Sequence, residues 1–248
     1  MIVCVGLATR DTIYRLPEFP EPDGRVVATE RVVAGGGPAA TAAVAIARLG
    51  VPVRFVGVVD GELPGVETHG MPGRMVESTI LVGPDGTRAI VTEQPERFDC
   101  PPGLLEDADW IHADHVGYNA IPARNTVQLS VDAGFPLPDA DVAAVDLWSP
   151  PEVLDDGRRG RLTVVTRGAH GCTAYTADGE TIDVPGEHVD GLVSTLGAGD
   201  VFHGALLAAF AHGLGLRDAL GAANRAAALS CRALDGRSAI PTWDEVTP

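Results

Sequence analysis

The chain contains no lysine: all 18 of its basic residues are arginine, set against 34 acidic residues. This absence excludes a Walker A loop, a protein-kinase strand lysine and a Schiff base, because each of these requires a lysine. The formal net charge of −16 argues against nucleic acid or an anionic membrane surface as a partner. A phosphate bound by this protein must therefore be held by backbone amides, arginine or a metal ion.

Long hydrophobic runs and paired cysteines are also missing. No apolar run reaches the roughly 18 residues of a membrane-spanning helix. Residues 1–7 are typical of a buried strand and not of a signal peptide. The cysteines lie far apart, with no metal-ligand or redox spacing (Cys4, Cys100, Cys172 and Cys231). We expect reduced thiols, a cytoplasmic location and no membrane partner.

The residues that are present favour one α/β domain. The chain has 248 residues, of which 45% are hydrophobic, which is enough for one sizeable core. Short apolar strands alternate with helical patterns, which predicts a mostly parallel sheet covered on both faces. The expected strands are 2–7, 53–59, 109–113, 142–146 and 162–166. The expected helices are 38–49, 122–133, 200–213 and 217–233.

Two extended segments interrupt this alternation. Residues 25–33 and 76–92 read as partly exposed strands, and Gly83-Pro84-Asp85-Gly86 is a strong turn signal inside the second segment. They predict a small β lid over the mouth of the sheet, with two ordinary surface hairpins as the alternative.

The segment Ser194-Thr195-Leu196-Gly197-Ala198-Gly199-Asp200 carries the strongest chemical signal. It leads into an amphipathic helical pattern, so Gly197 to Asp200 should form the N-terminus of a helix. Free amides and the helix dipole make that position an anion site, which a phosphate can approach closely where glycine lacks a Cβ. A carboxylate is repelled by a phosphate, so its place beside this site is explained if it takes part in proton transfer. The alternative is an aspartate that caps a helix after a glycine turn.

A second glycine-rich segment lies near the N-terminus. Gly35-Gly36-Gly37-Pro38-Ala39-Ala40-Thr41 precedes a helix rich in alanine and valine, with Pro38 at its first position and Gly50 just past its end. Glycines before a tightly packed helix let a small polyol approach the backbone, although a flexible entry turn explains them equally well.

Together the two segments resemble the PfkB, or ribokinase-like, carbohydrate kinase family. That family has a glycine-rich segment near its N-terminus and an Asp-Thr-x-Gly-Ala-Gly-Asp segment near its C-terminus, in this order. The likeness extends over nearly the whole chain. It includes the strand before Asp11, the run Val165 to Cys172, and the segments Asn224 to Ala228 and Ser238 to Pro241. Residues 35–50 and 197–206 look most similar to bacterial sulfofructose (6-deoxy-6-sulfofructose) kinases.

The resemblance implies a ribokinase-like three-layer α/β/α sandwich with a mostly parallel sheet and a small β lid. A single kinase domain would span residues 1–248, with lid strands from about 12–35 and 76–96. ATP and Mg²⁺ are the implied cofactors, a small sugar is the implied substrate, and a homodimer through the lid is expected.

The family's functional residues carry over onto matching positions. Asp200 would be the catalytic base, beside an anion hole formed by the amides of Gly197, Ala198 and Gly199. The implied substrate-binding residues are Asp11, Arg25, Gly36, Gly37 and Thr41. The implied nucleotide-binding residues are Thr166, Gly168, Gly171 and Asn224, and the implied metal ligand is Glu152.

The chain also departs from the family pattern. Ser194 replaces the first aspartate of the C-terminal segment, which places a monovalent-cation site in question. The Asn-x-x-Glu motif linked to magnesium keeps only Glu152, for which an exposed glutamate in a proline turn is the alternative. The helix that family members have after Asp60 is largely missing, with residues 61–73 in its place. A second segment of the family pattern is lost around residues 134–150.

Three further alternatives remain open at this point. Arg25 and Arg88 are candidates for binding a sulfonate or are solvated lid charges, and His203 either reaches the site or is satisfied within its helix. A nucleoside kinase of the same fold, or a non-catalytic sugar- or nucleotide-binding relative, are the alternatives to a sugar kinase.

Overall fold

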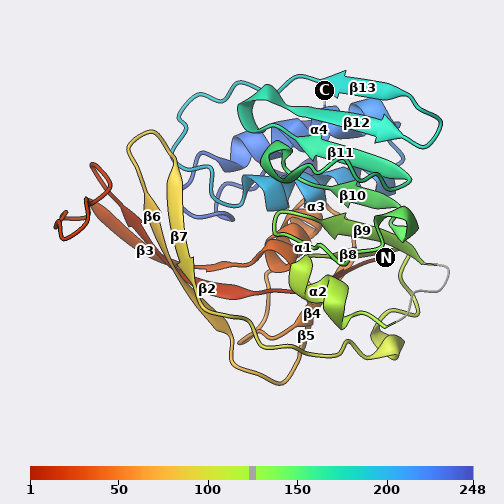
Figure 1. The fold of residues 1–248 in the computed structure, drawn as a ribbon, viewed down its shortest axis with the longest axis horizontal. Coiled ribbons are helices and arrows are strands. Elements are labelled where there is room, and N and C mark those ends of the chain that lie inside the picture. The colour runs from red at the N-terminus through yellow and green to blue at the C-terminus, as the bar shows by residue number, and fades with distance from the viewer. Residues whose placement is uncertain (123–126, 248) are drawn as a thin grey trace.

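The structure, a computed structural model, describes residues 1–122 and 127–247. Its main sheet has nine strands in the order β13-β12-β11-β10-β9-β8-β1-β4-β5, which are parallel except that β12 runs antiparallel to its neighbours β11 and β13 (Figure 1). The strands are β1 (Ile2–Val5), β4 (Val53–Gly57), β5 (Glu67–Gly70), β8 (Trp110–Ala113), β9 (Gln128–Asp132), β10 (Leu147–Ser149), β11 (Leu162–Thr166), β12 (Cys172–Thr176) and β13 (Thr181–Val184).

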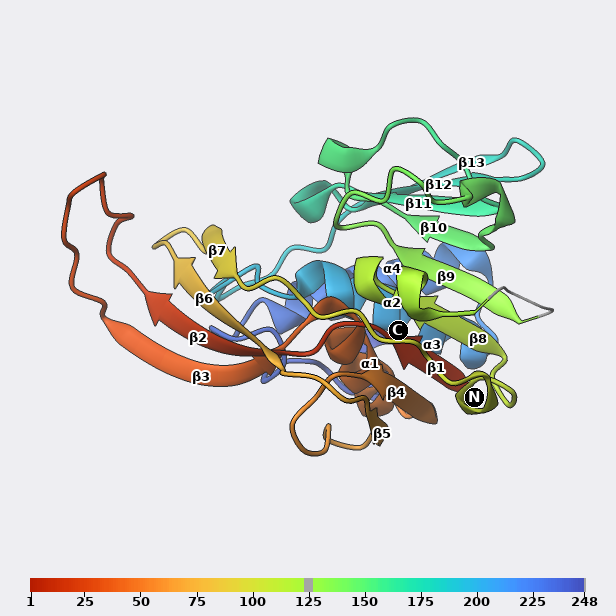
Figure 2. The ribbon, with the colours of Figure 1, turned by 60° about the horizontal axis from the view of Figure 1, so that its bottom comes forward.

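A second sheet, called the lid below, projects from one side of this body (Figure 2). Its order is β3-β2-β6-β7, built from β2 (Thr9–Arg15), β3 (Glu30–Gly36), β6 (Val76–Val82) and β7 (Arg88–Thr92). Its inner face packs on the body through a small apolar cluster of Ile13, Ile80, Val82, Leu196 and Leu234. Because β2 follows β1 after only Gly6 to Ala8, the lid begins at the carboxyl end of β1, which lies between β8 and β4.

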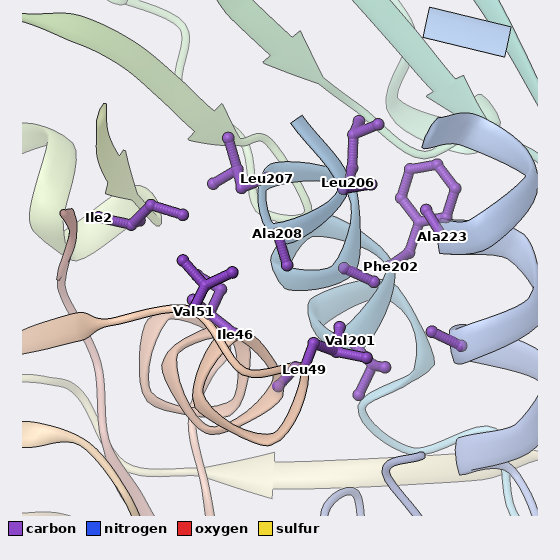
Figure 3. Packing of buried hydrophobic residues seen from close by; sticks show 14 of the residues in the cluster. Ile2, Ile46, Leu49, Val51, Val201, Phe202, Leu206, Leu207, Ala208 and Ala223 are labelled. Carbon is purple, nitrogen blue, oxygen red and sulfur yellow. The ribbon is translucent and has the colours of Figure 1, made fainter. Parts of the chain in front are cut away.

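One face of the main sheet is covered by three long helices, α1 (Pro38–Arg48), α3 (Ala198–Ala211) and α4 (Leu216–Ser230). The middle helix, α3, is buried along most of its length, and its apolar side chains meet those of both neighbours (Figure 3). The contact between α1 and α3 is so close that a Cβ on Gly204 would lie 2.5 Å from the carbonyl oxygen of Ala42. This packing fixes the N-termini of α1 and α3 beside each other.

The opposite face has a thinner cover. It consists of the short helix α2 (His115–Ala120), the single-turn 3₁₀ segments and irregular chain, which enclose a second apolar core. The 3₁₀ segments are η1 (Pro102–Leu104), η2 (Val142–Ala144), η3 (Glu152–Leu154) and η4 (Gly168–His170). A last short helix, α5 (Trp243–Val246), packs on α4 on the other side. No helix lies between β4 and β5, as expected from the sequence.

Two predicted elements were wrong. The expected helix over 122–133 contains strand β9, and residues 123–126 of that prediction lie outside the described residues. Leu129 and Val131 alternate with buried polar residues between β8 and β10, so the segment is buried on both faces. The expected strand over 142–146 is a 3₁₀ turn, and β10 follows it at Leu147. None of the helices in the described ranges is long and apolar enough to cross a membrane.

Candidate active site

The candidate site lies where the carboxyl ends of central strands meet the N-termini of α1 and α3. Asp114, which follows β8, joins these parts: its carboxylate accepts hydrogen bonds from the amides of Leu7 (2.7 Å) and Ala39 (3.2 Å). It also caps α2 by accepting from the amides of Val116 and Gly117. This is the edge of an open α/β sheet at which ligands commonly bind.

The predicted anion hole has the backbone geometry of a helix start. Gly197 is the N-cap of α3 with a φ of 74°, a left-handed conformation that favours glycine. A Cβ at this position would lie 2.9 Å from the Cα of Gly236, so the turn also needs glycine for space. No side chain caps the helix, and the amide of Ala198 makes only a long, 3.4 Å bond to the carbonyl of Thr195. The first turn of α3 therefore offers amides to an anion.

Asp200 lies in this first turn and is partly buried. Burial raises the pKa of its carboxyl group to about 7, and the nearby Asp132 carboxylate adds to the rise, while His203 and Arg88 oppose it. A carboxylate that titrates near neutral pH is suited to accept a proton from a hydroxyl group.

Several of the predicted substrate-binding residues lie around Asp11 on β2. Thr9 Oγ1 donates a 2.6 Å hydrogen bond to its carboxylate, whose pKa is raised by burial. Gly36 lies against the same group: an added Cβ would be 1.9 Å from Asp11 Oδ2. Gly37 has a φ of 91° and packs on the carbonyl of Leu7, which its Cβ would meet at 2.4 Å. The structure thus brings Asp11, Gly36 and Gly37 together.

Arg237 is a residue of this region that sequence reasoning missed. Its Nε donates to Thr41 Oγ1 (3.1 Å) and its Nη2 donates to the carbonyl of Gly36 (2.6 Å). Burial lowers the pKa of its guanidinium to about 10, against the influence of Asp11 and Asp200. Within the described ranges no carboxylate forms a salt bridge with it. The only signal in the sequence was an arginine after a glycine in the tail.

A cavity of about 620 Å³ adjoins this arginine. It lies between the base of the lid, α1, the loop after β4 and the tail, and Arg10, Arg48 and Arg237 contribute to its lining. The loop that replaces the expected helix, Asp60 to Pro64, contributes another wall.

The two lid arginines lie in different places. Arg25 is exposed in the long loop between β2 and β3. This loop forms the end of the lid that lies away from the body (Figure 2). Arg88, on β7, donates from Nη1 to Thr195 Oγ1 (2.9 Å), next to the anion hole. The carbonyl of Gly86 accepts from the amide and hydroxyl of Thr195 (3.2 and 3.1 Å), so the β6–β7 turn contacts the anion-hole loop directly.

Two of the predicted nucleotide-binding residues, Gly171 and Asn224, contact one segment, Val184 to Pro185. Gly171 has a φ of 86°, and its Cβ would meet the carbonyl of Val184 at 2.2 Å. Asn224, buried on α4, donates to the carbonyl of Pro185 (3.0 Å). Gly168, with a φ of 55°, belongs to η4 in the turn that ends at Gly171. The amide of Thr166, at the end of β11, donates to the carbonyl of Pro150 (3.1 Å).

Glu152 follows that proline turn as an exposed side chain at the start of η3. In residues 1–122 and 127–247, no group of three or more His, Cys, Asp or Glu side chains is arranged to hold a metal ion. Mg²⁺ in phosphoryl-transfer sites is commonly held by one or two carboxylates, phosphates and water. A single exposed carboxylate at a strand end fits that kind of donor set.

Comparison with known proteins gives the class. Residues 147–243 match the model of the pfkB family of carbohydrate kinases. The ATP-dependent ribose-1-phosphate kinase of Halopiger xanaduensis is 28% identical over 99% of this chain and 96% of its own length. The ribokinase of Bacillus subtilis is 27% identical over 99% and 97%. The structure of ribokinase from Giardia lamblia superposes with a TM-score of 0.82 at 17% identity, covering 99% and 97% of the two chains.

By these findings the chain is similar to carbohydrate kinases of the PfkB, or ribokinase, family. The predicted three-layer α/β/α fold is confirmed by the ribokinase structure. The predicted enzyme class is confirmed as well, because the full-length relatives are phosphotransferases with an alcohol acceptor. Other structures of this fold, at 17–19% identity, were solved with ribose and ATP, with ADP, or with inosine.

Proposed function

We propose that this protein transfers the γ-phosphate of ATP to a hydroxyl group of a small sugar or sugar derivative. The observation that carries the proposal is Asp200: a partly buried carboxylate with a pKa of about 7, in the first turn of a helix that begins at an obligate glycine. A capping aspartate does not explain this geometry, because Gly197 holds the N-cap position and Asp200 lies inside the helix.

The reaction follows from that arrangement. Asp200 accepts the proton of the sugar hydroxyl as its oxygen forms a bond to the γ-phosphorus, and the bond from that phosphorus to the bridging oxygen breaks to release ADP. The amides at Gly197, Ala198 and Gly199 stabilise the charge on the transferred group. Mg²⁺ bound with ATP would neutralise phosphate charge, and Glu152 is the carboxylate proposed to hold it.

The remaining predicted residues have roles in binding. Asp11, Gly36, Gly37 and Thr41 are proposed to hold sugar hydroxyls, and Thr166, Gly168, Gly171 and Asn224 to position the nucleotide. The contact of the β6–β7 turn with Thr195 supports closure of the lid over the site, which excludes water.

A sugar with an anionic substituent is the second candidate substrate. Arg237 is a largely buried guanidinium between Asp11, Thr41 and Asp200 that lines the cavity. A buried cation is costly unless it is paired, so a phosphate or sulfonate on the sugar would suit it. The ribose-1-phosphate kinase relative and the likeness to sulfofructose kinases both point to this class. Arg25, the residue first predicted for that role, lies at the far end of the lid.

We also propose that the protein is a homodimer through the lid. Val33 and Val91 on its outer face are 49% and 71% exposed, and a second lid would cover them. Sedimentation velocity tests this directly, and a monomer at micromolar concentration overturns it.

An ADP-release assay with ATP and Mg²⁺ tests the kinase proposal across neutral sugars, phosphorylated sugars, sulfosugars and nucleosides. We expect Asp200→Asn to lower kcat by about 10²–10⁴-fold, the usual range for loss of a general base. Turnover of nucleosides alone would assign a nucleoside kinase. Ligand-induced stabilisation without turnover above the variant would favour a non-catalytic relative.

The same assay decides the substrate class. If an anionic substituent binds at Arg237, Arg237→Met raises KM for the anionic sugar by about 10–100-fold, the size expected for one charged hydrogen-bonding partner. KM for ATP stays unchanged. Equal activity of the wild type on neutral and anionic sugars would contradict this second candidate.

A further inference from the structure

A cluster of buried polar side chains lies behind Asp200 and has no role in the proposal above. Each of its members is at most 5% exposed: His112, Ser130, Asp132, Ser149 and His203. The sheet register creates the cluster, because His112 pairs with Ser130 across β8 and β9, and Asp132 pairs with Ser149 across β9 and β10. His203 reaches it from α3, about one helical turn after Asp200.

His203 lies between two carboxylates. Its Nδ1 is 3.2 Å from Oδ2 of Asp132, within ion-pair distance, and Asp200 precedes it on the same face of α3. On its other side the ring of His112 lies 6.0 Å away between centroids, and Nδ1 of His112 contacts Ser130 Oγ at 3.0 Å. The edge of His203 also meets Phe202, at 5.9 Å between ring centroids.

The cluster lowers the stability of the fold. His112 Nε2, Ser149 Oγ and His203 Nε2 are buried without a hydrogen bond to any described residue, and His203 Nδ1 has only its ion-pair contact with Asp132. Each buried polar atom without a partner costs roughly 1–3 kcal/mol. Apolar side chains would fill the same space at no such cost, so packing alone does not explain these residues.

The pKa values of the two histidines shift in opposite directions. Burial disfavours the charged form of both, but the Asp132 carboxylate outweighs burial at His203, with help from Asp200, and raises the pKa of His203 above its usual value. The pKa of His112 falls to about 4 through burial and the nearby His203. His203 is therefore the histidine whose charged form the surroundings favour, and Asp132, whose pKa His203 lowers to about 2, is the carboxylate beside it.

We propose that protonated His203, held by Asp132, is a positioning residue that supplies the countercharge for the ionised Asp200. The proposal rests on Asp200 being the base of the proposed kinase reaction. The other charged groups that face Asp200 are Arg88 from the lid, Arg237 from the tail and Asp114 from the end of β8, besides Asp132 itself. Unlike these groups, His203 lies on the same helix as Asp200.

The experiment is a pH profile of kcat/KM for the full chain and His203→Gln. Loss of the cation raises the pKa of Asp200, so the acid limb of the variant moves to higher pH and its loss of activity is greater at pH 6 than at pH 8. Adding Asp132→Asn to His203→Gln removes the repelling charge and moves the limb back toward lower pH. Ser149→Ala, which removes an unpartnered hydroxyl of the same cluster without changing its charge, leaves the limb in place.

A purely structural role gives a different result. Thermal stability would then fall in His203→Gln while the acid limb stayed where the wild type has it, and that outcome overturns the proposal. If His203→Gln does not fold, ¹³C NMR titration of the histidines in the wild type and Asp200→Asn replaces it. The His203 pKa must be above the ordinary value in the wild type and lower in Asp200→Asn, and no change overturns the proposal.

The two proposals fail separately. Undiminished turnover by Asp200→Asn removes the kinase mechanism itself. An inactive Asp200→Asn together with an unmoved limb in His203→Gln removes only the role of His203.

Discussion

The two ends of the candidate site are built in different ways. At the α3 end, the anion hole and Asp200 belong to a helix packed between α1 and α4 inside the largest apolar core. At the lid end, one small cluster centred on Ile13 and Ile80 holds a four-stranded sheet against the body. The proposed catalytic groups are therefore fixed by the core, whereas the proposed substrate-binding wall depends on a few contacts of its own.

Electrostatics differ between the two ends as well. Asp200 has a buried imidazole and a buried carboxylate behind it, those of His203 and Asp132, which lie within ion-pair distance of each other. Asp11, at the lid end, has a hydroxyl partner in Thr9 and the guanidinium of Arg237 nearby. The first arrangement is suited to tuning a proton acceptor, and the second to holding a polar ligand.

The largest expected effect comes from substituting the glycines at the α3 end. Gly197→Ala introduces strain at a φ of 74° and a 2.9 Å contact with backbone, so we expect about 1–3 kcal/mol lower unfolding free energy and at least a ~100-fold loss of kcat. Urea unfolding and the ADP-release assay measure both.

Gly199→Ala is the matched control. Its Cβ meets nothing within 4 Å and alanine favours a helix, so the fold should be unharmed. We still expect kcat to fall, because the methyl group lies where the phosphate approaches the amides. A fully active Gly199→Ala would show that this face of the turn does not bind phosphate.

Sequence patterns found the α3 end because its signals are local. Gly197 to Asp200 and the following helix are contiguous, and the structure places Asp200 in the first turn as the spacing predicted. The cluster behind it was missed because strand register brings Asp132 and His112 to His203 from far along the chain. Strand β9 itself was mistaken for a helix. Arg237 was missed for the same reason, since only the folded chain brings it to Thr41.

Loosening the lid should have the next largest effect. Ile80 and Ile90 are cross-strand neighbours on β6 and β7, but Ile80 is 1% exposed and Ile90 is 49% exposed. Ile80→Ala removes a buried contact worth about 2–4 kcal/mol and should raise KM for the sugar, with little change in KM for ATP. Ile90→Ala should cost less than about 1 kcal/mol. Equal KM values in the two variants would mean that lid packing does not control sugar binding.

The link between the two ends should contribute less. Arg88→Met removes the hydrogen bond to Thr195 and a positive charge near Asp200, and we expect a roughly 3–10-fold lower kcat/KM, as for one partly exposed hydrogen bond. Arg25→Met, on the exposed lid loop, should change kcat/KM less than about twofold. A larger loss in Arg25→Met would instead support its predicted substrate role, acting across a lid-to-lid dimer.

The smallest effect concerns stability at the α3 end. Because the pKa of Asp200 is about 7 in the folded state and near 4 when unfolded, the native state binds the extra proton between these values. Stability therefore falls as the pH rises through this window, and the deficit persists above pH 7.

Asp200→Asn removes the buried charge, so its Tm should exceed that of the wild type by about 2–4 °C at pH 8.5, with the difference shrinking toward pH 4. Asp190→Asn, at a carboxylate that is 95% exposed, is the control and should show no such trend. If the Tm difference between wild type and Asp200→Asn did not change with pH, ionised Asp200 would not destabilise the fold. The electrostatic difference between the two ends of the site would then be contradicted.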